Sequence, residues 1–375
     1  MRYLKNYNIF SIAKVLLISI LFAPNIEYLN FDKFILFFFI LIFFTLIIFN
    51  SSLFFNFKYE NLFFTSIILL YYAKSYLIFG IYDFYFFYKI LSFGLIIWFL
   101  YISFSNQLDH QKIAKLKKFF VFLILILGIL AISLKLLLYF VDFRTFFTFY
   151  SFERIFLQKR LFTFNYGGTG LSFIFALCYL IILNNKFFNL TLTIIFKFFL
   201  IFCAYLSGKT GLFLIILYEV IYFNYKFIYK INTKYYFTFL IVIATVILIV
   251  TASVFQIFEN QINIIFKSPL RALEQFKIID ATIIEIISGK LNRNFQASDS
   301  AFIYHIQLLG VPVILMFIHK FFLINLAKSL KKNNIELNLL ILSSFLYAFK
   351  SNLLFDIKLC IILSIIYPIL EYKKL

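Results

Sequence analysis

The chain has 375 residues, of which 64% are hydrophobic, 23% aromatic and only 14% charged. Because soluble domains are typically about 45–50% apolar and about 25% charged, this composition excludes a water-soluble domain. The net charge is +19, but the lysines are scattered between long apolar runs, so the charge indicates positive cytoplasmic loops rather than a nucleic-acid partner.

Long, continuous apolar runs recur along the whole chain. A helix needs about 20 apolar residues to cross about 30 Å of hydrocarbon, whereas an outer-membrane barrel would show alternating strands of about ten residues. The runs therefore predict an all-α fold, a polytopic transmembrane helical bundle of about 12 spans that forms a single membrane domain over residues 1–375. The predicted spans cover residues 8–23, 34–50, 62–80, 84–104, 119–141, 166–183, 188–206, 210–228, 236–256, 302–322, 337–352 and 357–371.

The run from Ile9 to Pro24 has the charge and length of a signal peptide, but further spans follow at once, so it is predicted to be an uncleaved first helix. Lysine and arginine in the loops predict the orientation, because cytoplasmic loops carry an excess of them. With the N-terminus inside, the short outer loops hold only Lys33, Lys209 and Lys358, so both termini are predicted to be cytoplasmic. The basic residues assigned to the inner side are Arg2, Lys5, Lys58, Lys112, Lys115, Lys117, Lys118, Lys186, Lys226, Lys230, Lys234, Lys328, Lys331, Lys332, Lys373 and Lys374.

Arginine is concentrated in two longer outer loops, residues 142–165 and 257–301. The chain has 29 lysines and six arginines, and five of the six arginines fall in these loops. A guanidinium group stays charged and makes planar, bidentate contacts with phosphate or carboxylate. The pattern predicts a clamp for an anionic group at the outer surface, with loop solubility and anchoring at lipid phosphates as the alternative. The five residues are Arg144, Arg154, Arg160, Arg271 and Arg293.

Glycines gather at the outer ends of spans six, seven and eight. Glycine permits either close approach of a ligand or tight packing of helices, and both interpretations stay open. Gly208-Lys209-Thr210 is similar to the end of a P-loop, but Cys203 occupies the position of the required earlier glycine and the turn faces outside. ATP binding is therefore excluded. The clustered glycines are Gly167, Gly168, Gly170, Gly208 and Gly211.

Ionisable residues inside the spans need partners. Lys197 and Glu219 each lie about 13 Å below the outer surface on adjacent antiparallel helices, so we predict that they are close together. A structural ion pair is the favoured interpretation, and a role in transport is the alternative. His305 lies one turn into span ten, below Asp299, and is a candidate for proton transfer or substrate contact.

The second long loop contains a predicted helix that starts at Ser268-Pro269, because proline is favoured in the first helical turn. Apolar and charged residues then alternate at near-helical spacing, which predicts an amphipathic helix on the outer membrane surface, with a solvated loop helix as the alternative. Its apolar residues are Leu270, Leu273, Phe276, Ile283 and Ile287, and its charged residues are Arg271, Glu274, Lys277, Asp280 and Glu285.

The three cysteines, Cys178, Cys203 and Cys360, lie within apolar runs, and their spacing matches neither a zinc site nor a disulfide framework. They are predicted to be buried thiols. The chain contains no HExxH motif, Cys/His constellation or cytoplasmic paired aspartates, so we expect no metal and no cofactor.

Three short stretches resemble the O-antigen polymerase and ligase superfamily, the Wzy-type polymerases of surface polysaccharides. Arg160 followed by Asn165 is similar to the family's Arg-to-Asn start of a helix. Residues 206–211, Leu-Ser-Gly-Lys-Thr-Gly, resemble its Ser-Gly-Ser-Arg-Thr-Gly turn. Residues 298–302, Ser-Asp-Ser-Ala-Phe, and the later pair 309–310, Leu-Gly, resemble its loop-to-helix motif. The resemblance covers mainly residues 140–320.

Two positions depart from the family pattern. Lys209 stands where the family usually has arginine, so bidentate geometry is lost at the turn. Ligases characteristically have a histidine where this chain has Asp299, which favours a polymerase over a ligase.

The resemblance implies a metal-independent glycosyltransferase in the bacterial cytoplasmic membrane. Its substrate would be an oligosaccharide repeat on polyprenyl pyrophosphate, and the growing glycan would pass to the next lipid-linked repeat at the outer face. Implied partners are membrane lipids and, as an open point, a chain-length regulator protein, with no nucleic acid. The expected catalytic residues are Arg154, Arg160, Arg271, Arg293 and Asp299, and the expected substrate-binding residues are Arg144, Glu153, Asn165, Gly167, Gly168, Lys209 and His305.

Two alternatives stay open. The first is an O-antigen ligase or another polyprenyl-phosphate-dependent glycosyltransferase. The second, from another class, is a flippase for the same lipid-linked sugars. A transporter built from repeats should show two matched halves, but the long outer loops follow predicted spans five and nine, which are not equivalent positions in halves of six.

Overall fold

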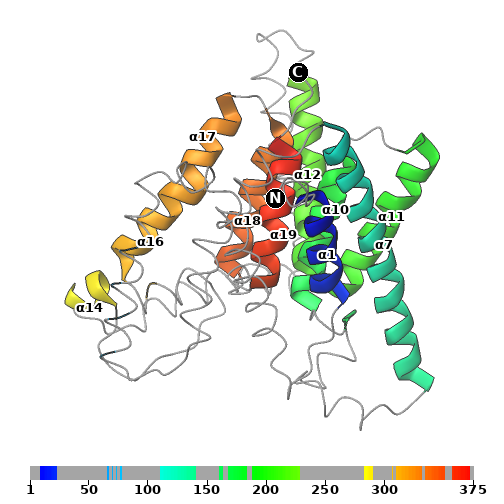
Figure 1. Cartoon of the computed structure of the whole chain (residues 1–375), viewed down its shortest axis with the longest axis horizontal. Coiled ribbons are helices and arrows are strands. Elements are labelled where there is room, and N and C mark those ends of the chain that lie inside the picture. The colour runs from blue at the N-terminus through cyan, green and yellow to red at the C-terminus, as the bar shows by residue number, and fades with distance from the viewer. Residues whose placement is uncertain are drawn as a thin grey trace, which may run out of the picture.

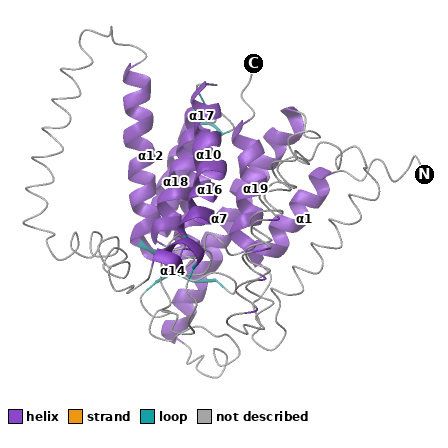
Figure 2. Ribbon diagram, turned by 90° about the vertical axis from the view of Figure 1, so that its left-hand side faces the viewer, coloured by secondary structure: helices purple, strands orange, loops and turns teal. Residues whose placement is uncertain are grey.

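The computed structural model describes residues 9–22, 66, 70, 73, 77, 110–140, 160–163, 168–183, 188–228, 283–289, 306, 310–331, 334–350 and 357–371. Within these ranges all regular secondary structure is helical and no strand occurs (Figures 1 and 2), which confirms the all-α prediction. The predicted spans 34–50, 84–104 and 236–256, and all but four residues of 62–80, lie outside the described ranges.

The described helices follow the predicted spans closely. Hydropathy detects them because each is an apolar segment with few charges. Their bounds are α1 Ile9–Phe22, α7 His110–Phe140, α10 Gly168–Leu183, α11 Leu190–Ser207, α12 Lys209–Ile228, α14 Ile283–Ser288, α16 Val311–Ile318, the π-helix η4 His319–Leu323, α17 Ile324–Lys331, α18 Ile335–Lys350 and α19 Ile357–Glu371.

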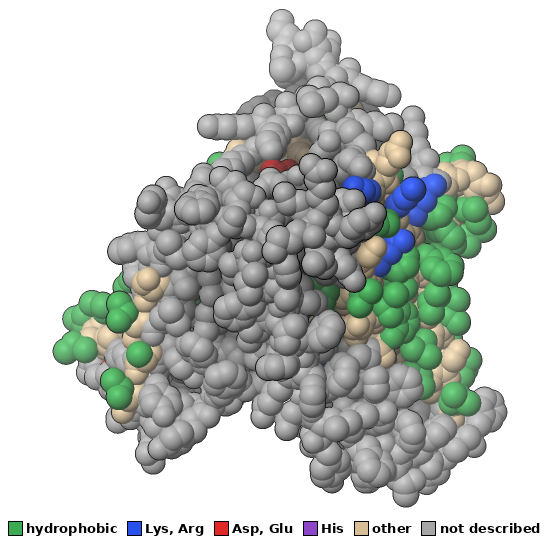
Figure 3. All heavy atoms as spheres, in the orientation of Figure 1, with side chains coloured by type: hydrophobic (Ala, Val, Ile, Leu, Met, Phe, Trp, Pro, Cys, Tyr) green, Lys and Arg blue, Asp and Glu red, His purple; other side chains and the backbone are tan. Residues whose placement is uncertain are grey.

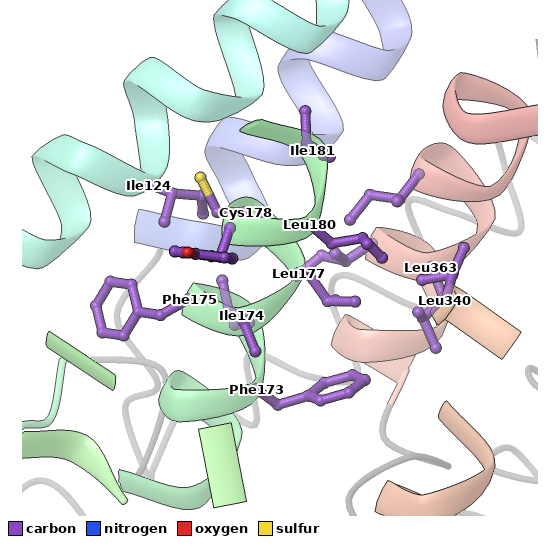
Figure 4. Close-up of a cluster of buried hydrophobic side chains, with 14 of the residues drawn as sticks. Ile124, Phe173, Ile174, Phe175, Leu177, Cys178, Leu180, Ile181, Leu340 and Leu363 are labelled. Carbon is purple, nitrogen blue, oxygen red and sulfur yellow. The ribbon is translucent and has the colours of Figure 1, made fainter. Parts of the chain in front are cut away.

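Helix α10 lies at the centre of the bundle and is buried from Gly170 to Leu183. Helices α7, α11, α12 and α18 pack around it, α1 packs against α7, and α19 packs against α18. Because α10 is apolar on every side, it can be surrounded completely. Figure 4 shows its side chains pointing both ways, with Cys178 toward Ile124 of α7, and Leu177 on the side of Leu340 and Leu363.

Helices α10, α11 and α12 alternate in direction along the chain, and so do α18 and α19, as the predicted topology requires. The start of α10 meets the end of α11, and the Phe173 ring stacks on the Tyr347 ring near the end of α18, with the centroids 4.1 Å apart. At the other end of the bundle, the Asn334 Nδ2 donates to the Leu370 carbonyl of α19 over 2.7 Å. We call the end with the α11–α12 connection the turn end and the opposite end the lysine-rich end.

The lysine-rich end carries those described lysines of α7 and α12 that the sequence assigns to the inner side. Helix α7 begins there, since the buried Lys117 interacts electrostatically with Glu336 at the start of α18. Lys115 and Lys118 are exposed beside it, and Lys226 lies in the last turn of α12. The exposed Lys209 begins α12 at the other end, and Arg160 precedes Leu161, whose amide bonds to the Leu206 carbonyl oxygen there.

Two of the described helices are long and apolar enough to cross a membrane, at Gln111–Leu137 in α7 and Leu190–Ser207 in α11. The outward face of α11 is apolar along its length, and Leu190 and Phe198 are 76% and 68% exposed. Figure 3 shows hydrophobic side chains covering this flank of the molecule. An exposed apolar surface of this extent requires a non-aqueous partner.

Two helices differ from the predicted spans. Helix α7 begins at His110, nine residues before the predicted span 119–141, because its first turns are basic and hydropathy detects the hydrocarbon boundary rather than the helix start. The predicted span 302–322 is interrupted, because Gly310 has φ 82° and α16 starts at Val311 with Pro312 in its first turn. The helical path then continues through η4 to Lys331.

Gly310 lies against the described part of the second outer loop. A Cβ at this position would meet the Ile287 carbonyl oxygen at 2.1 Å, so only glycine fits both the positive φ and the close contact. Ile287 belongs to α14, whose isoleucines are all exposed, with Ile283 at 76% and Ile284 at 66%. Residues 268–282 of the predicted amphipathic helix lie outside the described ranges.

Candidate functional site

The candidate site lies at the turn end and begins with residues 160–163. Arg160 is exposed, while Leu161, Phe162 and Thr163 are buried. The Leu161 amide donates a hydrogen bond to the Leu206 carbonyl oxygen, with N and O 3.0 Å apart. That carbonyl is at the end of α11, where the last carbonyls of a helix have no partner within the helix. The main chain therefore holds Arg160 beside the α11–α12 turn.

Gly168 allows residues 160–163 and the α11–α12 turn to approach each other closely. A Cβ on Gly168 would lie 2.4 Å from the Ser207 carbonyl oxygen and 2.9 Å from the Arg160 Cδ. Without a side chain at this position, the start of α10 fits under the stem of Arg160 and against the end of α11. Two stretches that are more than 40 residues apart in the sequence thus meet at one point.

The α11–α12 turn is fixed by close packing on α10. The Gly208 amide donates to the Ala204 carbonyl oxygen over 2.9 Å, and its φ of 172° is an extended conformation that any residue adopts. A Cβ on Gly211 would lie 2.2 Å from the Ser172 carbonyl oxygen of α10. Of the two interpretations of the glycine cluster, tight helix packing is thus confirmed at Gly168 and Gly211.

The turn end combines helix ends of both signs with cationic side chains. Helices α10 and α12 start there, at Gly168 and Lys209, and α11 ends there at Ser207, so positive and negative helix ends lie side by side. Arg160 and Lys209 are both exposed. Guanidinium and ammonium groups are side chains that bind phosphate or carboxylate groups.

A second polar cluster lies deeper, between α10, α11 and α12. The Lys197 Nζ is 2.8 Å from the Glu219 Oε1, which confirms the predicted proximity of these two residues. The Tyr179 hydroxyl donates to the same oxygen, and the Lys197 Nζ lies 5.2 Å from the centre of the Tyr179 ring. Tyr179 was not predicted from the sequence, although its distance of eleven residues from the start of α10 places it at the same depth.

Most predicted site residues lie outside the described ranges, so their positions stay predictions. The nearest described part of the second arginine-bearing loop is α14. Figures 1 and 2 place α14 at the turn end, and Figure 1 shows α18 and α19 between it and the α11–α12 turn. The residues outside the described ranges are Arg144, Glu153, Arg154, Asn165, Gly167, Arg271, Arg293, Asp299 and His305.

The cysteine prediction is confirmed where the structure describes the side chains. Cys178 and Cys203 are buried and free. The Cys203 Sγ lies 3.2 Å from the position that a Cβ on Gly128 of α7 would take, which places this thiol in the α7–α11 contact. The side chain of Cys360 lies outside the described set.

No protein-family model, curated protein or solved structure matches the chain.

Proposed function

We propose that this protein is a polytopic glycosyltransferase of the bacterial cytoplasmic membrane that polymerises lipid-linked oligosaccharide repeats. Its substrates would be polyprenyl-pyrophosphate-linked glycans of the O-antigen or capsule type, used at the outer face of the membrane. The proposal includes about 12 spans and cytoplasmic termini. The lysine-rich end of the described bundle supports the orientation, because positive loops remain inside.

The close approach of Gly168 to both Arg160 and the Ser207 carbonyl oxygen carries the proposal. The sequence resemblance rests on separate short stretches, and two of them are in direct contact at one end of the bundle. The Leu161 amide donates to the Leu206 carbonyl oxygen at the end of α11, next to the α11–α12 turn. The third stretch, residues 298–302, lies outside the described ranges.

The proposed reaction requires an anion site and no metal. An acceptor hydroxyl attacks the anomeric carbon of the donor glycan, the bond from that carbon to the pyrophosphate oxygen breaks, and polyprenyl pyrophosphate leaves. Arg160 and Lys209 would stabilise the charge that develops on the leaving oxygen. A carboxylate, either Asp299 or Glu153, would accept the hydroxyl proton. In this mechanism, the pyrophosphate is also bound by three further arginines, Arg154, Arg271 and Arg293.

Deletion of the encoding gene followed by electrophoresis of surface glycans tests the function. A polymerase predicts loss of the long ladder, with a single repeat still attached to its acceptor. Loss of all attached glycan would indicate a ligase, and intracellular accumulation of lipid-linked repeats would indicate a flippase. Either of these two results would overturn the polymerase proposal.

Substitution of the arginines tests the site. Arg160→Ala and Arg271→Ala are each expected to abolish chain extension, while the protein inserts at the normal level. Arg160→Lys, which keeps the charge but loses bidentate geometry, should retain part of the ladder. Lys226→Ala is the matched control, because it removes one cation at the opposite end of the bundle. Normal surface-glycan ladders from both arginine-to-alanine variants would refute the proposal that these arginines bind the anionic group.

A further inference from the structure

One face of α7 is exposed along most of the helix. Its residues are polar or basic at the start of the helix and mostly apolar after that. Its exposed residues follow one another at steps of three or four, which places them on a single face. Gln111 is followed by two lysines, Lys115 and Lys118, and the next are apolar, with Phe122 60% and Ile129 58% exposed. The opposite face, which includes Leu116, is buried against α1, α10 and α11. The exposed positions on this face are Gln111, Lys115, Lys118, Phe122, Ile126, Ile129, Ser133 and Leu136, and Leu137 is also exposed.

The apolar part of this face has the length of a bilayer core. Lys118 and Leu137 are 19 residues apart, which corresponds to about 28 Å along a helix, and the hydrocarbon core is about 30 Å thick. With the apolar part in hydrocarbon, Lys115 and Lys118 lie at the level of the lipid headgroups on the lysine-rich side.

A third ammonium group lies at the same level on the neighbouring helix. The Lys14 Nζ of α1 is 4.4 Å from the centre of the Phe10 ring and 4.9 Å from the centre of the Phe119 ring. Phe119 follows Lys115 by four residues on α7, so Lys14 lies on the side of the helix that carries Lys115. Figure 3 shows basic side chains gathered at this end, bordering the apolar flank.

We propose that Lys14, Lys115 and Lys118 form a binding site for one anionic phospholipid of the inner leaflet. The lipid phosphate would contact the three ammonium groups, and an acyl chain would lie along Phe122 and Ile126. A lipid fits better than an acidic protein segment, because the cationic patch continues into an exposed apolar face of bilayer length. This inference rests on the proposed membrane placement and is independent of glycan transfer.

The test uses the full-length protein, purified in a neutral detergent. Phosphatidylglycerol and phosphatidylcholine with identical acyl chains are titrated separately, and bound lipid is measured by native mass spectrometry. The wild type is expected to retain phosphatidylglycerol selectively. Each lysine near a headgroup strengthens anionic-lipid binding by about fivefold, so Lys115→Gln combined with Lys118→Gln should weaken it by about 30-fold. A variant that keeps both positive charges, Lys115→Arg combined with Lys118→Arg, should bind phosphatidylglycerol like the wild type.

Lys226→Gln is the matched control, because Lys226 is exposed at the same end of the bundle but belongs to α12. It should bind phosphatidylglycerol like the wild type. Variants are compared only if their size-exclusion elution matches that of the wild type, and single lysine variants replace the pair if it fails. The proposal is overturned by unchanged binding in the α7 variants, by equal loss in Lys226→Gln, by equal binding of phosphatidylcholine, or by displacement of the lipid with millimolar inorganic phosphate or a polyglutamate peptide.

Discussion

At the residue scale, the Tyr179–Lys197–Glu219 cluster illustrates how a membrane bundle accommodates charge. Both Lys197 and Glu219 are partly exposed, at 24% and 43% of their side chains, and lie about ten residues from the turn end of their helices. An isolated charge at such a depth is costly, and a partner within hydrogen-bond distance offsets that cost. One carboxylate oxygen accepts from both the lysine and the tyrosine. The cluster therefore joins three helices.

A double-mutant cycle tests this ion pair. Lys197→Met and Glu219→Gln should each lower the thermal midpoint of the purified protein, because each leaves the other residue with a missing partner. The double variant should lose less than the sum of the two, with a coupling free energy of about 1 kcal/mol. Additive losses would show that the two side chains do not interact.

Glycine substitutions at the α10–α12 contact provide a second test. Gly211→Ala should destabilise the protein by about 2 kcal/mol, because the new Cβ would lie 2.2 Å from the Ser172 backbone oxygen and a helix must move. Gly208→Ala is the control, since its nearest contact, the Ser172 Oγ, is 3.3 Å away and belongs to a small side chain that can shift. Equal losses in thermal unfolding would contradict this packing argument.

Contacts between residues were predictable from the sequence where depth alone decides proximity, and other contacts were missed. Lys197 and Glu219 lie on helices joined by a short turn, so equal depth implies contact. Tyr179 carries no charge and lies on a third helix, whose rotation about its axis the sequence does not determine. The contact between Leu161 and Leu206 is between main-chain atoms and has no side-chain signal at all.

At the element scale, asparagine begins two helices in different ways. The Asn189 Oδ1 accepts from the Leu192 amide over 3.0 Å and caps α11 in an exposed position. The Asn334 Oδ1 accepts from the Leu337 amide over 3.2 Å, and its Nδ2 also donates to the Leu370 carbonyl at the end of α19. The second asparagine is buried and joins two helix ends.

This difference predicts unequal costs of substitution. Asn334→Ala should destabilise the protein by about 2–3 kcal/mol, because a cap is lost and a buried carbonyl loses its donor. Asn189→Ala should cost about 1 kcal/mol or less, since water can replace an exposed cap. Thermal unfolding of the two variants in one detergent gives the comparison, and a larger loss for Asn189→Ala would refute it.

Helix existence was predictable and helix ends were less so. Apolar runs locate α10, α11, α12, α18 and α19 within about two residues, because lipid and core both require apolar side chains. The start of α16 depends on the φ of Gly310 and its contact with Ile287, which a hydropathy profile does not contain. The five-residue π-helix η4 is likewise a property of packing, since Phe322 in it meets the Phe345 ring of α18.

At the scale of the whole molecule, the distribution of basic residues predicts which end faces the cytoplasm. In a chain whose three cysteines are replaced by alanine, Lys209→Cys should react with a membrane-impermeant maleimide in intact spheroplasts. Lys115→Cys should react only after the membrane is opened, because it lies at the lysine-rich end. Labelling of both variants from the same side would contradict the proposed topology.

The hydrogen bond from the Leu161 amide to the Leu206 carbonyl determines which positions near it can be substituted without moving the main chain. The tether does not depend on the side chains at positions 160 and 161, except that proline at position 161 has no amide hydrogen to donate. Under the proposed function, exchange of the exposed Arg160 would therefore change the recognised group while the chain keeps its path.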